Sequence, residues 1–258
     1  MSRIASVFSK PGHKALIPYV TVGYPSVEAT LKIAPLLARS GADIIELGIP
    51  FSDPLADGTT IQKASLCALK NGVTPKRCLE VAAELRKRVD IPLVFMTYYN
   101  PVLNSGLEEF CHSSAKAGID GLIVPDLPPE EGAALGIPAE EQGIDLIYLL
   151  APTSTEARIR LVCDRSRGFI YLVSVTGITG TRDSLPQDLE DFVLRVRKTA
   201  RQPLCVGFGI SSAEQAKRVA RVADGVIVGS RLIQLIESGE DFTSALRFVS
   251  GLRQALGS

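Results

Sequence analysis

The segment ELGIPFSDPLADG, residues 46–58, places acidic side chains within and directly after an apolar run. Glu46 stands among isoleucine and leucine, where an ionised and unpartnered carboxylate costs several kcal/mol. Asp57 follows on a segment that contains two prolines and is better hydrated. Two carboxyl groups in such different surroundings differ in protonation, which is the arrangement that general acid–base chemistry uses.

Each of these carboxyl groups also has a purely structural interpretation. Glu46 could belong to a buried ion pair, and Asp57 could form an Asp-Gly turn with Gly58. The residue types alone leave both interpretations open.

Glycines at the ends of two apolar runs indicate a phosphate site. The segment VGFGISSAEQ continues into a helix in which Ser211 and Glu214 fit a capping box. The segment VIVGS places Gly229 and Ser230 before a short helix. Glycine lets the backbone approach a ligand closely, and free N–H groups at a helix N-terminus suit an anion. Because barrels often bind phosphate at this position, we predict that the two loops share one phosphate.

A third loop, SVTGITGTRDS, is rich in glycine and threonine and contains Arg182. We interpret it as a lid that closes over substrate and excludes water. A surface loop without that role is the alternative.

The elements that must position these residues are short apolar runs, nearly continuous as in parallel strands that are covered on both faces. They are residues 15–23, 42–49, 91–99, 119–126, 144–152, 168–177, 202–209 and 223–230. Segments with helical spacing follow them, at residues 26–41, 74–89, 106–118, 129–143, 154–166, 189–200, 212–223 and 241–256.

Eight such repeats in 258 residues, about 32 residues each, predict a single (βα)8 TIM barrel over residues 1–258. We also expect an extra N-terminal helix and additional short helices in the βα loops, one of them at residues 60–72. A doubly wound open sheet is the rival fold, but it commonly has five or six strands. In the segment 129–143, Gly136 and Pro138 should disrupt the helix.

Composition excludes several classes of function. Lys plus Arg and Asp plus Glu are 28 each, so no long-range field favours nucleic acid or an anionic membrane. Five scattered cysteines and two histidines do not indicate a metal site or a Ser-His-Asp triad. Because the N-terminus lacks the pattern of a secretory signal, we expect a cytoplasmic protein.

Five segments carry a resemblance to a known family: ELGIPFSDPLADGTTIQ, GLIVPDLPPEE, GFIYLVSVTGITGTR, VGFGISS and VIVGS, in this order. Together they resemble the tryptophan synthase alpha subunit family along nearly the whole chain. The resemblance implies a (βα)8 barrel that cleaves indole-3-glycerol phosphate to indole and glyceraldehyde 3-phosphate. It implies neither a metal nor an organic cofactor.

The resemblance also implies roles for individual residues. The catalytic glutamate and aspartate correspond to Glu46 and Asp57, of which Glu46 shuttles protons and Asp57 stabilises charge on the indole N–H. Thr179, on the lid, corresponds to a threonine that orients the aspartate. The substrate contacts correspond to Tyr19, Met96 and Phe208 for indole, to Tyr171 beside the glutamate, and to Gly180, Gly209, Gly229 and Ser230 for phosphate.

A partner is implied in the same way. In the family a beta subunit, which carries pyridoxal phosphate, receives indole through a tunnel, and the two subunits form an alpha2beta2 heterotetramer. The residues at that contact correspond to Asp53, Pro54, Asn100 and Pro128.

Other readings remain at this point. A stand-alone indole-3-glycerol-phosphate lyase would share the fold and both carboxyl groups, and a non-catalytic activating subunit would share the fold. Without the resemblance, a sugar-phosphate isomerase or aldolase would lead. A Schiff-base aldolase needs a lysine at a strand end, and none of the eight runs offers one.

Overall fold

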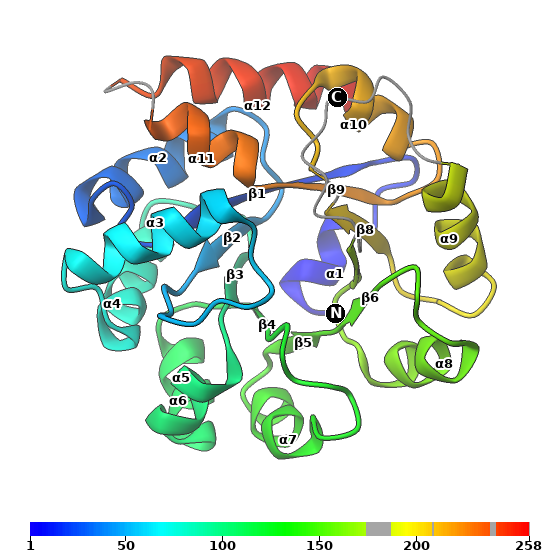
Figure 1. Ribbon diagram of the computed structural model, residues 1–258, viewed down its shortest axis with the longest axis horizontal. Helices are drawn as coiled ribbons and strands as arrows, with labels where there is room; N and C mark the ends of the chain where they lie inside the picture. Colours follow the sequence, from blue (N-terminus) through cyan, green and yellow to red (C-terminus); the bar gives the residue numbers. More distant parts are fainter. Residues whose placement is uncertain (174–186, 208, 238–240, 258) are drawn as a thin grey trace.

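The structure is a computed structural model that describes residues 1–173, 187–207, 209–237 and 241–257. Figure 1 shows a ring of strands surrounded by helices. The strands are β1 (Ala15–Thr21), β2 (Ile45–Gly48), β3 (Leu93–Met96), β4 (Gly121–Ile123), β5 (Asp145–Ile147), β6 (Leu149–Leu150), β7 (Ile170–Val173), β8 (Leu204–Gly207) and β9 (Gly225–Val228). The helices are α1 (Arg3–Val7), α2 (Val27–Arg39), α3 (Thr59–Lys70), α4 (Pro75–Arg86), α5 (Tyr99–Ser105), α6 (Leu107–Lys116), α7 (Ala133–Glu141), α8 (Glu156–Arg165), α9 (Gln187–Arg197), α10 (Ala213–Val219), α11 (Ser230–Glu237) and α12 (Thr243–Leu256). The predicted barrel, its N-terminal helix and its short loop helices α3, α5 and α11 are confirmed.

The described strands form one parallel sheet in the order β5-β4-β3-β2-β1-β9-β8-β7-β6. The strands β5 and β6 come from the single apolar run 144–152, which is interrupted at Tyr148. The N–H of Tyr148 donates to the side-chain oxygen of Ser166 at 3.1 Å. Because β5 pairs with β4 and β6 pairs with β7, the ring closes through this one segment. The eight predicted runs therefore correspond to nine described strands.

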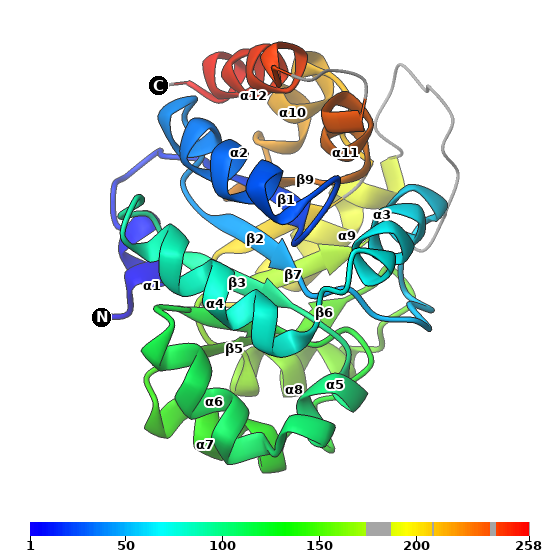
Figure 2. The same cartoon turned by 90° about the vertical axis from the view of Figure 1, so that its left-hand side faces the viewer.

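Apolar side chains fill the inside of the barrel at the amino ends of the strands. The helix α1 lies across this end, where Ile4 is fully buried and the Phe8 ring centroid is 6.3 Å from that of Phe169. Figure 2 shows α1 at one end of the barrel and α3 and α5 at the other. The inner cluster consists of Ile4, Ala15, Ile17, Ile44, Val94, Ile123, Ile147, Phe169, Cys205 and Ile227. This end of the barrel is therefore closed and apolar.

Three aspartates, each just before a strand, clamp neighbouring strands together at the amino end. Each carboxylate accepts a backbone N–H from the preceding strand and also pairs with an arginine of a surrounding helix. The sets are Asp43 with Leu16 N and Arg253 (2.8 and 2.8 Å), Asp120 with Leu93 N and Arg86 (2.9 and 2.7 Å), and Asp224 with Leu204 N and Arg197 (2.8 and 2.6 Å). Hydrogen bonds to charged groups are about twice as strong as neutral ones, so the clamps fix the strand ends firmly.

Two helices contain an internal proline and remain continuous. In α2, Pro35 cannot donate to the Leu31 carbonyl, and an Arg88 guanidinium N–H donates to it instead at 3.3 Å. The prediction that α7 is disrupted is wrong, because Gly136 N still donates to the Gly132 carbonyl at 2.8 Å and the Pro138 ring is buried. Packing here outweighs intrinsic helix propensity.

The clamps predict that removing one of their carboxylates destabilises the protein more than removing an exposed carboxylate. Asp120→Ala leaves Leu93 N and Arg86 without their carboxylate, so the free energy of unfolding should fall by about 2 kcal/mol in urea titrations. Asp120→Asn keeps one acceptor oxygen and should lose less. The control is Glu80→Ala, which removes only an exposed pair with Arg77 and should change stability by less than about 0.5 kcal/mol. Equal losses for Glu80→Ala and Asp120→Ala would contradict a special role for the clamp.

Candidate active site

Glu46 lies on β2 and points into the barrel above the apolar cluster. Its neighbours in the sheet are Tyr19 of β1 and Val94 of β3. The side chain is 0% exposed, and neither carboxyl oxygen has a hydrogen-bond partner among the described residues. Burial, with a smaller effect from the charge of Asp57, raises the pKa of Glu46 to about 8. Glu46 is therefore protonated at neutral pH, and nothing in the described structure supports the alternative of a buried ion pair.

Asp57 lies on the loop between β2 and α3. Its N–H donates to the Pro54 carbonyl at 3.0 Å, and Gly58 serves as the N-cap of α3. Burial raises the pKa of Asp57 to about 6, while a hydrogen bond from the Tyr98 side chain lowers it. The carboxyl group thus faces the interior, whereas a plain turn residue would face solvent. It remains ionised at neutral pH beside the protonated Glu46.

Two tyrosines form walls beside Glu46, and each extends over a glycine of an adjacent strand. A Cβ at Gly48 would lie 2.0 Å from the Tyr19 hydroxyl oxygen, and a Cβ at Gly207 would lie 2.5 Å from that of Tyr171. The charges of Glu46 and Asp57 raise the pKa of both tyrosines, after burial, which is the larger cause. These four side chains therefore form one cluster at the carboxyl ends of the strands.

Met96 completes the described part of the predicted indole pocket. It ends β3 and lies opposite Gly48 in the sheet register. Its half-buried side chain packs against the inner cluster. Phe208, the other residue predicted for this pocket, lies outside the described residues.

The predicted phosphate loops follow β8 and β9, which are neighbours in the sheet. Gly209 has φ +55°, and a Cβ at Gly229 would contact Tyr19 at 3.5 Å. Ser230 begins α11. The two loops are thus brought to the same edge of the site. Thr179, Gly180 and the predicted lid at 174–184 lie outside the described residues.

The predicted capping box is displaced by one residue. The N-cap of α10 is Ser212, whose hydroxyl accepts from Gln215 N at 3.3 Å. The Gln215 side-chain oxygen in turn accepts from Ser211 N at 2.8 Å. The prediction with Ser211 and Glu214 is wrong in register, because an equivalent Ser-x-x-Gln pattern begins one position later.

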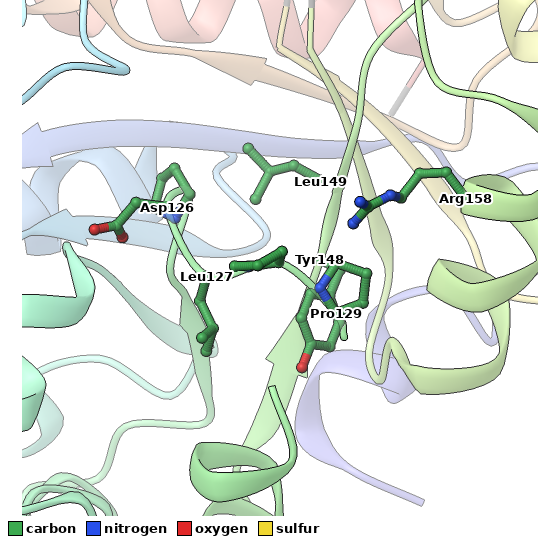
Figure 3. A pocket seen from close by; sticks show the side chains of 8 residues that line it. Asp126, Leu127, Pro129, Tyr148, Leu149 and Arg158 are labelled. Atoms are coloured by element: carbon green, nitrogen blue, oxygen red, sulfur yellow. The ribbon is translucent and has the colours of Figure 1, made fainter. Parts of the chain in front are cut away.

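A separate pocket of about 350 Å³ opens between the loop after β4 and the start of β6. Asp126 and Arg158 lie on opposite sides of it (Figure 3). Both are engaged, Asp126 with Tyr99 N at 2.9 Å and Arg158 with Glu130 at 2.7 Å. The pocket is lined by Pro125, Asp126, Leu127, Pro128, Pro129, Tyr148, Leu149 and Arg158, so neither catalytic candidate contributes to it. It lies beside the interruption at Tyr148, where the chain passes from β5, which pairs with β4, to β6, which pairs with β7.

Some site residues were not foreseen from the sequence. Tyr98 hydrogen-bonds Asp57, and Thr21 lies 3.2 Å from the Tyr19 hydroxyl oxygen and is fully buried. Gly48 makes room for Tyr19. The signal for Tyr98 was its place near the C-terminal end of the third apolar run, 91–99, since catalytic groups of such barrels sit at the carboxyl ends of the strands.

The fold and site define a class: a (βα)8 barrel that holds a buried, protonated carboxyl group beside an ionised one at the carboxyl ends of its strands. Among the described residues, no group of His, Cys, Asp and Glu side chains could hold a metal. The family model "Tryptophan synthase alpha chain" matches residues 6–253. The chain belongs to this family.

Individual relatives agree over the full length. The tryptophan synthase alpha chain of Dehalococcoides mccartyi is 58% identical, with 99% of this chain and 100% of the relative covered. That of Geobacter sulfurreducens is 48% identical, with 100% of both covered. Among solved structures, an alpha chain from Legionella pneumophila is 34% identical with TM-score 0.91, covering 99% of this chain and 97% of that one. A chain of tryptophan synthase from M. tuberculosis is 37% identical with TM-score 0.91, covering 99% of each.

Family membership fixes the reaction. The protein is a carbon–carbon lyase of tryptophan biosynthesis that cleaves indole-3-glycerol phosphate to indole and glyceraldehyde 3-phosphate. The reaction needs no cofactor, since pyridoxal phosphate belongs to the beta subunit.

The close approach at Gly48 yields a stability prediction. Gly48→Ala should lower the free energy of unfolding by about 2 kcal/mol, because the new Cβ collides with a packed ring. Tyr19→Leu in the same chain should recover part of the loss. Gly251→Ala is the matched control: no atom lies within 4 Å of its added Cβ, and it should gain up to about 1 kcal/mol within α12. Urea unfolding measures all three, and a neutral Gly48→Ala would show that the ring moves freely.

Proposed function

We propose that Glu46 carries both proton transfers of the cleavage. The observation that carries this proposal is a fully buried carboxyl group without a partner and with a pKa of about 8. Protonated Glu46 gives its proton to indole C3, and the resulting carboxylate takes the proton of the glycerol hydroxyl next to the breaking bond. The C–C electron pair then returns to the indole ring, the aldehyde forms, and Glu46 is protonated again.

We propose that Asp57 stabilises the positive charge that develops on the indole N–H during this sequence. An ionised carboxylate is required for that role, and the pKa of about 6 leaves Asp57 ionised at neutral pH. Fixed charges in a site that excludes water act more strongly than the same charges in water.

The remaining substrate contacts are proposals of the same kind. Tyr19 and Met96 would enclose the indole ring together with Phe208, and Tyr171 would contact substrate from beside Glu46. Backbone groups at the ends of β8 and β9 would hold the phosphate, with the contacts at Gly180, Gly209, Gly229 and Ser230. Thr179 would orient Asp57. The arrangement of the described members at one end of the barrel supports this assignment.

We propose that a beta subunit docks at this same end and that the two form an alpha2beta2 heterotetramer. The predicted contacts Asp53 and Asn100 are exposed, and Pro54 and Pro128 are half-buried. Next to them, Leu55 is 94% exposed and Leu103 is 52% exposed. Apolar side chains left in water beside a predicted contact are what a partner would cover.

A cytoplasmic location is also a proposal. Among the described helices, none is both long enough and apolar enough to cross a membrane. A biosynthetic reaction on a phosphorylated substrate fits that compartment.

Turnover of indole-3-glycerol phosphate, with and without a pyridoxal-dependent beta chain, tests the assignment. Glu46→Gln should abolish indole release, and Asp57→Asn should lower kcat about 100- to 1000-fold. Wild-type turnover should rise strongly with the beta chain. Fast turnover without it would favour a stand-alone lyase, and an active Glu46→Gln would remove Glu46 from the mechanism.

The two pKa values predict a bell-shaped dependence of kcat/KM on pH. Activity requires Asp57 ionised, so it should fall as pH drops through about 6, and it requires Glu46 protonated, so it should fall as pH rises through about 8. Initial rates between about pH 5 and 9.5 measure both limbs. Residual activity of Asp57→Asn should lack the acid limb. A profile that is flat up to pH 9 would contradict the assignment of Glu46.

A further inference from the structure

Tyr98 stands at the junction between the barrel and the loop that carries Asp57. It follows β3 by two residues and is the N-cap of α5. Its side chain is only 5% exposed. The hydroxyl nevertheless reaches the loop between β2 and α3, which comes from a different βα unit of the barrel.

The hydroxyl acts on two adjacent residues of that loop. It accepts the N–H of Ala56 at 2.9 Å, and as a donor toward the Asp57 carboxyl group it lowers the pKa of Asp57. The ring of Tyr98 also stacks on Phe51, with centroids 5.3 Å apart and planes at 30°. One side chain therefore contacts the loop at its beginning, at Phe51, and at Ala56, directly before Asp57.

The loop has few other restraints between these points. Leu55 is almost fully exposed and Ala56 is exposed. Short backbone bonds close the turn, from Leu55 N to the Asp53 carbonyl and from Asp57 N to the Pro54 carbonyl. These bonds shape the turn but do not fasten it to the barrel. Gln62 of α3 donates from Nε2 to the Asp57 carbonyl at 2.9 Å, and Tyr98 attaches the turn to the end of β3.

We propose that Tyr98 is a positioning residue that holds the loop carrying Asp57, and with it the Asp57 carboxyl group, in place for the cleavage. This inference rests on the proposed role of Asp57. A donor that is already in place also spares the loop the reorganisation that a solvent-held carboxylate would need at each turnover.

The other groups around Asp57 do not replace this donor. Glu46 on β2, Tyr19 on β1 and Tyr171 on β7 interact electrostatically with Asp57, and Asp126 after β4 acts on Tyr98. Each of these groups is negative when it ionises, so its charge opposes that of Asp57. Among the described residues, the Tyr98 hydroxyl is the group that favours the charged form of Asp57.

Tyr98→Phe tests the inference, because it removes the hydroxyl and keeps the ring on Phe51. At pH 7, kcat should fall about tenfold, as expected when one hydrogen bond to a charged group is lost. The acid limb of the pH profile should move to higher pH by about one unit, since the lost donor had favoured the ionised form. Activity should recover in part toward pH 8. The matched control Tyr99→Phe removes the next hydroxyl along the chain and should keep kcat within twofold.

A double-mutant cycle separates positioning from general structure. In the Asp57→Asn background, Tyr98→Phe should have less than a twofold further effect, because its target carboxylate is gone. A tenfold further loss there, or an acid limb that does not move, would overturn the inference. Carboxyl NMR titration of Asp57 in the wild type and in Tyr98→Phe provides a reading that needs no turnover, and an unchanged pKa would overturn it as well.

The same set separates this inference from the proposed function. Full activity of Asp57→Asn would remove the proposed role of Asp57, whatever Tyr98 does. An inactive Asp57→Asn together with a Tyr98→Phe that behaves like Tyr99→Phe would refute the positioning role alone.

Discussion

The structure depends on keeping one carboxyl group, that of Glu46, dry and without a partner. An unpaired charge there would be very costly, and the group responds by holding its proton up to a pKa of about 8. The folded chain thus binds a proton that the unfolded chain releases near pH 4.5, so this site makes folding less favourable as pH rises from about 4.5 to about 8. At about 1.4 kcal/mol per pKa unit, the cost reaches a few kcal/mol. The remainder of the barrel has to offset it.

Two features of the barrel contribute stability that offsets this cost. The inner cluster beneath Glu46 buries apolar side chains, and the aspartate clamps fix the strand ends around that cluster. Above Glu46, the tyrosines fit because glycines stand at Gly48 and Gly207. The closed, apolar half of the barrel lies at the amino ends of the strands, and the proposed site lies at the carboxyl ends, where loops can vary without loss of the core.

The sequence predicted what depends on local pattern. Apolar runs and helical spacing indicated the barrel, and a carboxylate in an apolar run indicated Glu46. The interruption at Tyr148 was not predicted, because Ser166, which binds its N–H, lies on a different segment. Tyr98 was missed for a similar reason: its function depends on a loop about 40 residues away in the chain. Spacing alone also could not decide which of the adjacent serines, Ser211 or Ser212, caps α10, because a glutamate or glutamine follows each of them three residues later.

The closed amino end of the barrel has a consequence for traffic through the site. Because α1 and the Phe8–Phe169 contact seal that end, a small apolar product such as indole has no exit there. In the proposed site, substrate entry and product departure would share the opening at the carboxyl ends of the strands. A protein bound over that opening would lie directly in the path of departing indole. Because the amino end of the barrel is closed, indole would reach such a neighbour by its position alone, without a separate binding site that attracts indole to it.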